Sequence, residues 1–143
     1  MSELTDFSIS RLGSPRLANP MSRLDNVTFI HDDERLLLNP HLLNGKPQDL
    51  DNSFEIAGPR KDIYFQPEEA RVAIVTCGGL CPGLNAVIRG LGMELWYTYG
   101  CQDIVGVRYG YQGFADGAEG PMVLTPDRVS GIREAGGTIL GSS

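Results

Sequence analysis

The feature that most constrains the fold is an apolar run followed by a glycine-rich loop. Residues 71–76 read Arg-Val-Ala-Ile-Val-Thr. Such a run is typical of a β-strand buried on both faces, as in a parallel sheet. Residues 77–83, Cys-Gly-Gly-Leu-Cys-Pro-Gly, predict a loop. Apolar residues at mostly three- and four-residue spacings then predict an amphipathic helix: Leu84, Val87, Ile88, Leu91, Leu95 and Tyr99.

Four residues refine the expected helix. Pro82 near its start fits a first-turn proline, and Gly100 fits a C-terminal cap. Gly90 and Gly92 lie inside the helical pattern, where each costs about 1 kcal/mol relative to alanine. We therefore expect these two glycines to allow close packing of the helix on a sheet.

The rest of the second half predicts two more strands and one more helix. Residues 104–107 predict a strand, and residues 109–114 a loop rich in glycine and aromatic side chains. A helix is expected over 126–135, with Thr125 as its N-cap and a proline in its first position. Residues 138–140 predict a third strand. The order strand, helix, strand, helix, strand indicates an α/β fold with a parallel sheet and right-handed crossovers.

The first half of the chain has a different character. Only three of the 18 glycines lie in residues 1–70, whereas six of the nine prolines do. Residues 1–26 are expected to form an arm, and residues 27–30 could form a hairpin with residues 36–38. We expect 1–70 to be an N-terminal extension and 71–143 a separate α/β domain.

Charge and cysteine content argue against several function classes. The net charge is −6 and no basic block occurs, which disfavours nucleic-acid binding. No apolar run approaches about 18 residues, so no membrane contact is expected. The N-terminus lacks the basic start and apolar core of a secretory signal. Three cysteines, an odd number, do not make a disulfide framework, and we expect a cytoplasmic protein.

The glycine-rich loop has the pattern of an anion-binding site. A strand, a glycine-rich turn and a helix N-terminus present free N–H groups to a phosphate, and Gly78, Gly79 and Gly83 are spaced for this role. The loop lacks the lysine of a P-loop, and its spacing differs from the Gly-x-Gly-x-x-Gly motif. By pattern alone, a tight turn without a ligand stays open as the alternative.

The wider sequence resembles the phosphofructokinase family. Residues 75–89, Val-Thr-Cys-Gly-Gly-Leu-Cys-Pro-Gly-Leu-Asn-Ala-Val-Ile-Arg, resemble its nucleotide loop in the ATP-dependent form of plants, trypanosomatids and some bacteria. Residues 54–65 resemble the N-terminal extension of that branch. Residues 105–114 resemble its second strand and adenosine-side loop, and residues 136–143 its third strand. The resemblance covers residues 54–143.

The resemblance implies a fold, an activity and a set of ligands. The fold is the Rossmann-like, parallel-sheet α/β half of a phosphofructokinase that binds the nucleotide, preceded by an irregular N-terminal extension. The activity is transfer of the ATP γ-phosphoryl group to the 1-hydroxyl of fructose 6-phosphate in glycolysis, with Mg²⁺, by a homo-oligomer (dimer or tetramer). Gly79 corresponds to the glycine that contacts the ATP phosphates, with Gly78 and Gly83 beside it. Tyr111 corresponds to a residue beside the nucleotide.

Other functional motifs of the family do not occur in these residues. A phosphate-contacting arginine, a Gly-Gly-Asp metal motif and a Thr-x-Asp-x-Asp motif with the base are absent, so we expect no catalytic residue or metal ligand within 1–143. The chain thus resembles the front part of a longer enzyme, expected to be inactive alone and to leave a sheet edge unpaired. Arg89 corresponds to an effector-site position of simpler bacterial enzymes, but Met93 replaces their second effector-site arginine.

The remaining candidate side chains have simpler interpretations. Cys77 and Cys81 are expected to fill the loop, because a zinc site needs two further ligands. Arg108 is expected to be a surface residue at a strand end, with phosphate contact as the alternative, whereas the glycine-flanked Tyr111 suits stacking on a base. Three acidic residues are expected to be solvated rather than catalytic: Asp116, Glu119 and Asp127.

Two function classes other than a kinase stay open. One is a non-catalytic fragment or pseudo-enzyme that binds partners through residues 1–70. The other is an unrelated βα module that binds a nucleotide or a flavin, and retention of a flavin by the purified chain would favour it.

Overall fold

The computed structural model describes residues 8–42, 44–46 and 48–142. The chain divides into two compact units, one ending at Tyr64 and one beginning at Phe65. The sequence predicts a domain boundary a few residues later, between residues 70 and 71, and that assignment stays a prediction. Within the described residues, no helix is long and apolar enough to cross a membrane.

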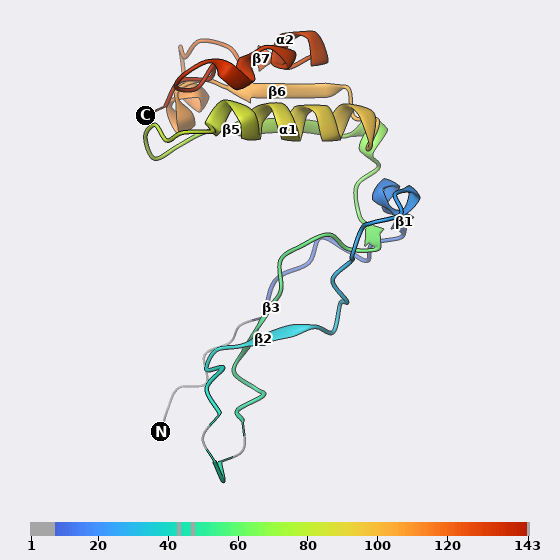
Figure 1. Ribbon diagram of the computed structural model, residues 1–143. Coiled ribbons are helices and arrows are strands. Elements are labelled where there is room, and N and C mark those ends of the chain that lie inside the picture. Colours follow the sequence, from blue (N-terminus) through green and yellow to red (C-terminus); the bar gives the residue numbers. More distant parts are fainter. Residues whose placement is uncertain (1–7, 43, 47, 143) are drawn as a thin grey trace. The chain divides into compact units, whose positions relative to one another are not determined.

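The second unit is built on a three-stranded sheet (Figure 1). β5 (Arg71–Val75) and β6 (Asp103–Val107) are parallel neighbours, with Ile74 opposite Gly106. β7 (Met122–Val123) pairs with the other side of β6 and runs antiparallel. The predicted α/β class and the parallel pair are confirmed. The sequence did not predict β7, whose antiparallel direction makes the whole sheet mixed.

β5 is an edge strand that is buried on one face. Ile74 belongs to the core, whereas Ala73, which points to the opposite face, is exposed. The prediction of a strand buried on both faces is therefore wrong, because an apolar run does not show which faces its neighbours cover. The outer edge of β5 has no strand partner among the described residues.

The predicted third strand, residues 138–140, is a turn. The N–H of Leu140 donates to Thr138 Oγ1 at 3.2 Å, and the N–H of Gly141 donates to the Thr138 carbonyl at 3.2 Å. A threonine that satisfies the backbone groups after it competes with sheet pairing. The segment instead crosses the end of β6, where the Leu140 carbonyl accepts a hydrogen bond from Tyr109 N–H at 2.8 Å.

The core of the second unit lies between the sheet and its helices. α1 (Leu84–Tyr97) follows the glycine-rich loop, and α2 (Pro126–Ser130) follows β7. Buried apolar side chains from these elements and their connections form one cluster: Ile74, Ile88, Cys101, Ile104, Leu124, Val129, Ile132 and Leu140. This cluster fixes α1, and with it the loop at its N-terminus, against the sheet.

Three expectations about α1 need correction. Pro82 lies outside the helix, because the N-cap is Gly83. The C-cap is Thr98, and Gly100, at φ +72°, turns the chain only after it. Neither internal glycine packs on the sheet. A Cβ added at Gly90 would meet no atom within 4 Å, and one added at Gly92 would lie 3.7 Å from Val129 Cγ2 of α2.

α2 begins as predicted and ends early. The Thr125 side chain accepts the Arg128 N–H at 3.4 Å, which confirms the predicted N-cap. The Ser130 hydroxyl donates to the Asp127 carbonyl at 3.0 Å, and the chain passes through Gly131 into a short 3-10 helix, η4 (Ile132–Glu134). A glycine and a back-bonding serine both weaken a continuous helix over 126–135.

The described residues of the first unit form two small antiparallel strand pairs. β1 (Leu17–Ala18) pairs with β4 (Asp62–Ile63), and β2 (Arg35–Leu37) pairs with β3 (Ser53–Glu55). The predicted hairpin is wrong, because residues 27–30 form no strand and β2 takes its partner from later in the chain. The described residues contain three further 3-10 helices: η1 (Pro20–Arg23) in this unit, and η2 (Pro67–Glu69) and η3 (Gly110–Phe114) in the second.

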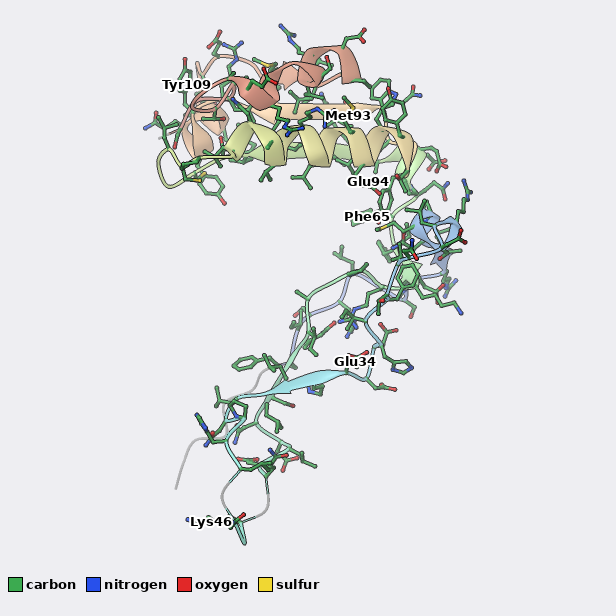
Figure 2. The ribbon with its side chains drawn as sticks, in the orientation of Figure 1. Glu34, Lys46, Phe65, Met93, Glu94 and Tyr109 are labelled. Carbon is green, nitrogen blue, oxygen red and sulfur yellow. The ribbon has the colours of Figure 1, made fainter. Side chains whose placement is uncertain are left out.

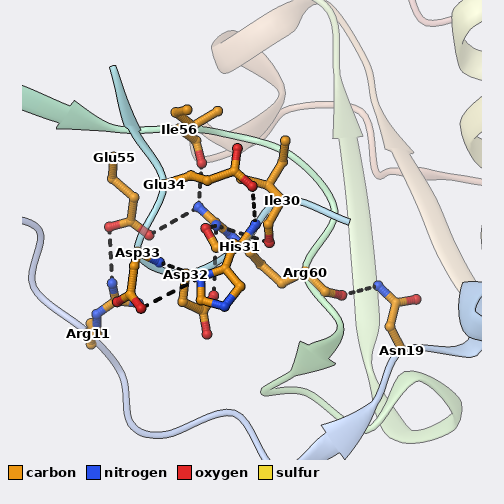
Figure 3. Close-up of polar contacts among 10 residues, drawn as sticks. All are labelled: Arg11, Asn19, Ile30, His31, Asp32, Asp33, Glu34, Glu55, Ile56 and Arg60. Carbon is orange, nitrogen blue, oxygen red and sulfur yellow. Dashed lines mark hydrogen bonds and ion pairs between the residues drawn. The ribbon is translucent and has the colours of Figure 1, made fainter. Parts of the chain in front are cut away.

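Arg60 organises this unit (Figure 3). Its side chain is only 19% exposed, and its guanidinium donates to the backbone carbonyls of Ile30, His31 and Ile56. Its nitrogens also lie 3.6 Å from a Glu55 oxygen and 3.7 Å from an Asp32 oxygen. The planar guanidinium thus joins residues 30–32 to residues 55–56, two segments that are not paired with each other as strands.

Replacing Arg60 with methionine is expected to loosen the first unit and to leave the second unchanged. Methionine keeps much of the apolar stem but leaves carbonyl groups without a donor, at a cost of about 1–3 kcal/mol for each buried group. Proteolysis or hydrogen exchange over β2 and β3 measures the change. Arg23→Met is the matched control, because Arg23 is exposed. Equal protection of β2 and β3 in both variants would contradict the role of Arg60.

Candidate functional site

The loop over residues 76–83 connects the carboxyl end of β5 to the N-terminus of α1 (Figure 1). Gly78, Gly79 and Gly83 have φ values of 90°, 92° and 90°, which L side chains rarely adopt. A Cβ added at any of the three would meet no atom within 4 Å. The glycines are thus needed for the turn, and the space beside them is open.

The backbone of this loop offers hydrogen-bond donors. Gly79 N–H donates to Ser142 Oγ at 3.0 Å. Within the described residues, the N–H groups of Gly78 and Gly83 have no acceptor, and Gly83 gives α1 no side-chain cap. Open N–H groups at the start of a helix of this length carry a partial positive charge, which suits an anion.

Residues 138–142, here called the strap, lie against this loop. The Thr76 hydroxyl donates to the Gly141 carbonyl at 3.0 Å. Asn85, which is 2% exposed, donates to the Ala135 carbonyl at 3.0 Å and accepts the Ile139 N–H at 2.9 Å. The first residue of the loop and the first turn of α1 are thus both bonded to the same segment.

The strap also contacts the loop that follows β6. Tyr109 (labelled in Figure 2) adopts φ 54°, and a Cβ on Gly141 would lie 2.6 Å from its ring. Tyr111, in η3, is 74% exposed, with its ring centroid 6.3 Å from that of Phe114. The ends of both parallel strands and the strap therefore border one region, which is where α/β sheets bind ligands.

Arg108 stands at the end of β6 and is partly buried. Its Nη1 lies 2.7 Å from Glu119 Oε1, and its Nε has no hydrogen-bond partner among the described residues. The expectation of a simple surface arginine is therefore incomplete. Asp116, Glu119 and Asp127 are exposed as expected, although Glu119 also forms the ion pair with Arg108.

The two positions related to an effector site lie on α1. Arg89 Nε donates to the Ser130 carbonyl at 3.3 Å, which links α1 to α2. Met93 (labelled in Figure 2) packs partly buried against the core. In this chain Arg89 thus links two helices, and Met93 helps to cover the core.

Sequence reasoning missed the polar contacts that shape the site: Thr76, Asn85, Ser142 and the backbone of the strap. Asn85 carried a usable signal, because it lies three residues before the buried Ile88 in the helical pattern. The sequence of the strap was misleading, because its β-branched and apolar residues predicted a strand where the structure has a turn. Within the described part of the chain, no group of three or more His, Cys, Asp or Glu residues could hold a metal ion.

Thiol labelling is expected to separate the three cysteines. Cys77 and Cys81 are exposed, whereas Cys101 is 1% exposed and its Sγ lies 3.2 Å from the Ala70 carbonyl. Burial raises the pKa of the Cys101 thiol, and the nearby Asp103 charge adds to this. A higher pKa leaves less of the reactive thiolate at a given pH.

Titration with a disulfide reagent near pH 8 should therefore show two fast thiols, and a third that reacts only after unfolding. In Cys101→Ala the slow phase should disappear, and in Cys77→Ser one fast thiol should be lost. Three thiols reacting at one rate in the folded chain would contradict this assignment.

The fold and site define an α/β protein with an open, glycine-lined loop at the carboxyl ends of two parallel strands. The family model "Phosphofructokinase" matches residues 71–143, and the chain belongs to the phosphofructokinase family. This confirms the resemblance noted in the sequence and removes the alternative of an unrelated βα module.

Curated relatives agree with this family. The chain is similar to the ATP-dependent 6-phosphofructokinase of Borreliella burgdorferi, at 40% identity over 99% of this chain and 33% of the relative. It is similar to the protein of the same name from Entamoeba histolytica, at 52% identity over 62% of this chain and 20% of the relative. It is also similar to that of Trypanosoma cruzi, at 37% identity over 96% of this chain and 30% of the relative. The chain thus spans no more than about a third of the length of these relatives.

Proposed function

We propose that this chain supplies the ATP-binding part of an ATP-dependent 6-phosphofructokinase, which transfers the γ-phosphoryl group of ATP to the 1-hydroxyl of fructose 6-phosphate. The observation that carries the proposal is the open glycine loop, residues 76–83, inside the segment that matches the family. The names of the relatives supply the nucleotide and the reaction class.

In this proposal the open backbone N–H groups of Gly78 and Gly83 bind the ATP phosphates directly, and Gly79, whose N–H donates to Ser142 Oγ, lies beside the phosphates. Phosphoryl transfer depends chiefly on positioning and on stabilising charge, so N–H donors fixed before the ligand arrives are useful. The exposed ring of Tyr111 lies beside the nucleotide, where it can stack on the base. Arg108, which keeps one nitrogen unpaired, is not needed for either contact.

The described residues do not fit a magnesium site. Mg²⁺ prefers carboxylate and water oxygens, whereas the loop and the strap present N–H and hydroxyl groups and contain no acidic side chain. No step here depends on a metal bound by these residues. We further propose a cytoplasmic homo-oligomer that acts in glycolysis, with its catalytic base outside residues 1–143.

Two measurements test the proposal. Calorimetric titration of the chain with ATP should show saturable binding. Adenosine, which lacks the phosphates, should bind with a lower affinity than ATP. The protein expressed from its complete gene should phosphorylate fructose 6-phosphate with ATP in preference to pyrophosphate. ATP binding without any phosphoryl transfer by the complete protein would favour a non-catalytic member of the family, and a lack of ATP binding would overturn the proposal.

A further inference from the structure

The Ser142 hydroxyl lies against the glycine loop, with Gly79 N–H donating to its oxygen at 3.0 Å. A hydroxyl can accept one hydrogen bond and donate another. Within the described residues the Ser142 hydroxyl has no acceptor for its own hydrogen. That hydrogen can therefore point at an anion in the open space beside Gly78 and Gly79.

The backbone next to Ser142 is held in place. The Leu140 side chain is buried, and its carbonyl accepts Tyr109 N–H at 2.8 Å. The Gly141 carbonyl accepts the Thr76 hydroxyl at 3.0 Å, so the residue before Ser142 is bonded to the first residue of the loop. Moving the Ser142 backbone away from the loop would require these contacts to break.

This anchoring decides between two roles for the hydroxyl. In one, Ser142 fills the place of a phosphate oxygen at Gly79 and must be expelled when the nucleotide binds. In the other, it stays and donates its hydrogen to the phosphate. Expulsion needs another Ser142 χ1 rotamer or a shift of the strap and loses the bond from Gly79 N–H, whereas donation keeps that bond and needs only a rotation of the hydroxyl hydrogen. The contacts therefore favour donation.

We propose that Ser142 of the strap is a phosphate-binding residue, whose hydroxyl accepts the Gly79 N–H and donates its own hydrogen to a nucleotide phosphate oxygen. Thr76 is a positioning residue, because it acts on Ser142 through the Gly141 carbonyl. The inference rests on the proposed function, since it requires that the loop binds ATP. The absence of acidic side chains from the loop and strap agrees with an anionic ligand.

The test compares Ser142→Ala with Ser142→Thr in the same chain. The alanine variant should bind ATP about tenfold more weakly, as expected for one lost hydrogen bond to a charged group, and the threonine variant should regain most of the affinity. Adenosine affinity and the thermal midpoint should be unchanged in both variants. Ser130→Ala is the matched control, because its hydroxyl bonds to Asp127 within α2.

Each outcome bears on the proposal. Unchanged ATP affinity in Ser142→Ala would overturn it, and tighter binding would show that the hydroxyl is expelled. An equal loss for ATP and adenosine would indicate a structural role and would also overturn it. These results leave the proposed function intact, whereas a wild-type chain that binds no ATP would remove both.

Discussion

Replacing Gly79 with aspartate is expected to reduce the ATP affinity of this chain by about a hundredfold or more. A carboxylate about 5 Å from a phosphate charge costs roughly 3 kcal/mol at an effective dielectric constant near 20. Each 1.4 kcal/mol is about a tenfold change in the dissociation constant. A side chain at φ 92° strains the turn, but a Cβ at Gly79 would meet no atom within 4 Å and aspartate tolerates a positive φ better than most residues, so the second unit should still fold.

Gly79→Asn is the matched control for charge. Asparagine has nearly the same shape and also tolerates the left-handed region, so its loss of affinity reports steric and backbone effects alone. The affinity should fall in the order glycine, asparagine, aspartate, and added salt should narrow the gap between the last two. Equal affinity for the two variants would argue that no phosphate lies near Gly79.

Replacing Asn85 with alanine is expected to destabilise the second unit by about 2–4 kcal/mol and to weaken ATP binding. The substitution leaves the Ala135 carbonyl and the Ile139 N–H without their side-chain partner in a buried position. A buried polar group without a partner costs about 1–3 kcal/mol. Because the same bonds hold the strap beside the loop, stability and binding should fall together.

Denaturant unfolding and calorimetric titration measure the two effects. Asn85→Asp keeps an acceptor for Ile139 N–H, loses the donor to the Ala135 carbonyl and buries a charge, so it should be no more stable than the alanine variant. Gln102→Ala is the control, because Gln102 is exposed and lies between α1 and β6. It should change neither the free energy of unfolding nor the ATP affinity. A fully stable Asn85→Ala variant would show that the strap is held without this side chain.

The local pattern predicted the parts of the fold that depend on local physics. β5, the glycine-rich loop and α1 follow from residues adjacent in sequence, and the N-cap at Thr125 follows from a side chain that bonds three residues away. The direction of β7 and the turn over 138–140 depend on which distant segments compete for the same backbone groups. Patterns of apolar residues do not contain that information.

The candidate site likewise has a part that the local sequence predicts and a part that it does not. The glycines were predictable, because the turn and the helix that they permit lie beside them in sequence. The contacts of Thr76, Asn85 and Ser142 were not, because each joins the loop region to a segment far along the chain. Arg60 in the first unit is similar, since its acceptors include carbonyls 29 and 30 residues before it.

The long reach of the strap has a consequence for the order of folding. Its bonds to the loop and to α1 span 65, 63 and 54 residues, so closing them carries a large entropic cost that early local structure does not offset. During synthesis from the N-terminus, the loop leaves the ribosome long before the segment that holds it. Nucleotide affinity should therefore appear as a late event in refolding, after the helical signal of α1.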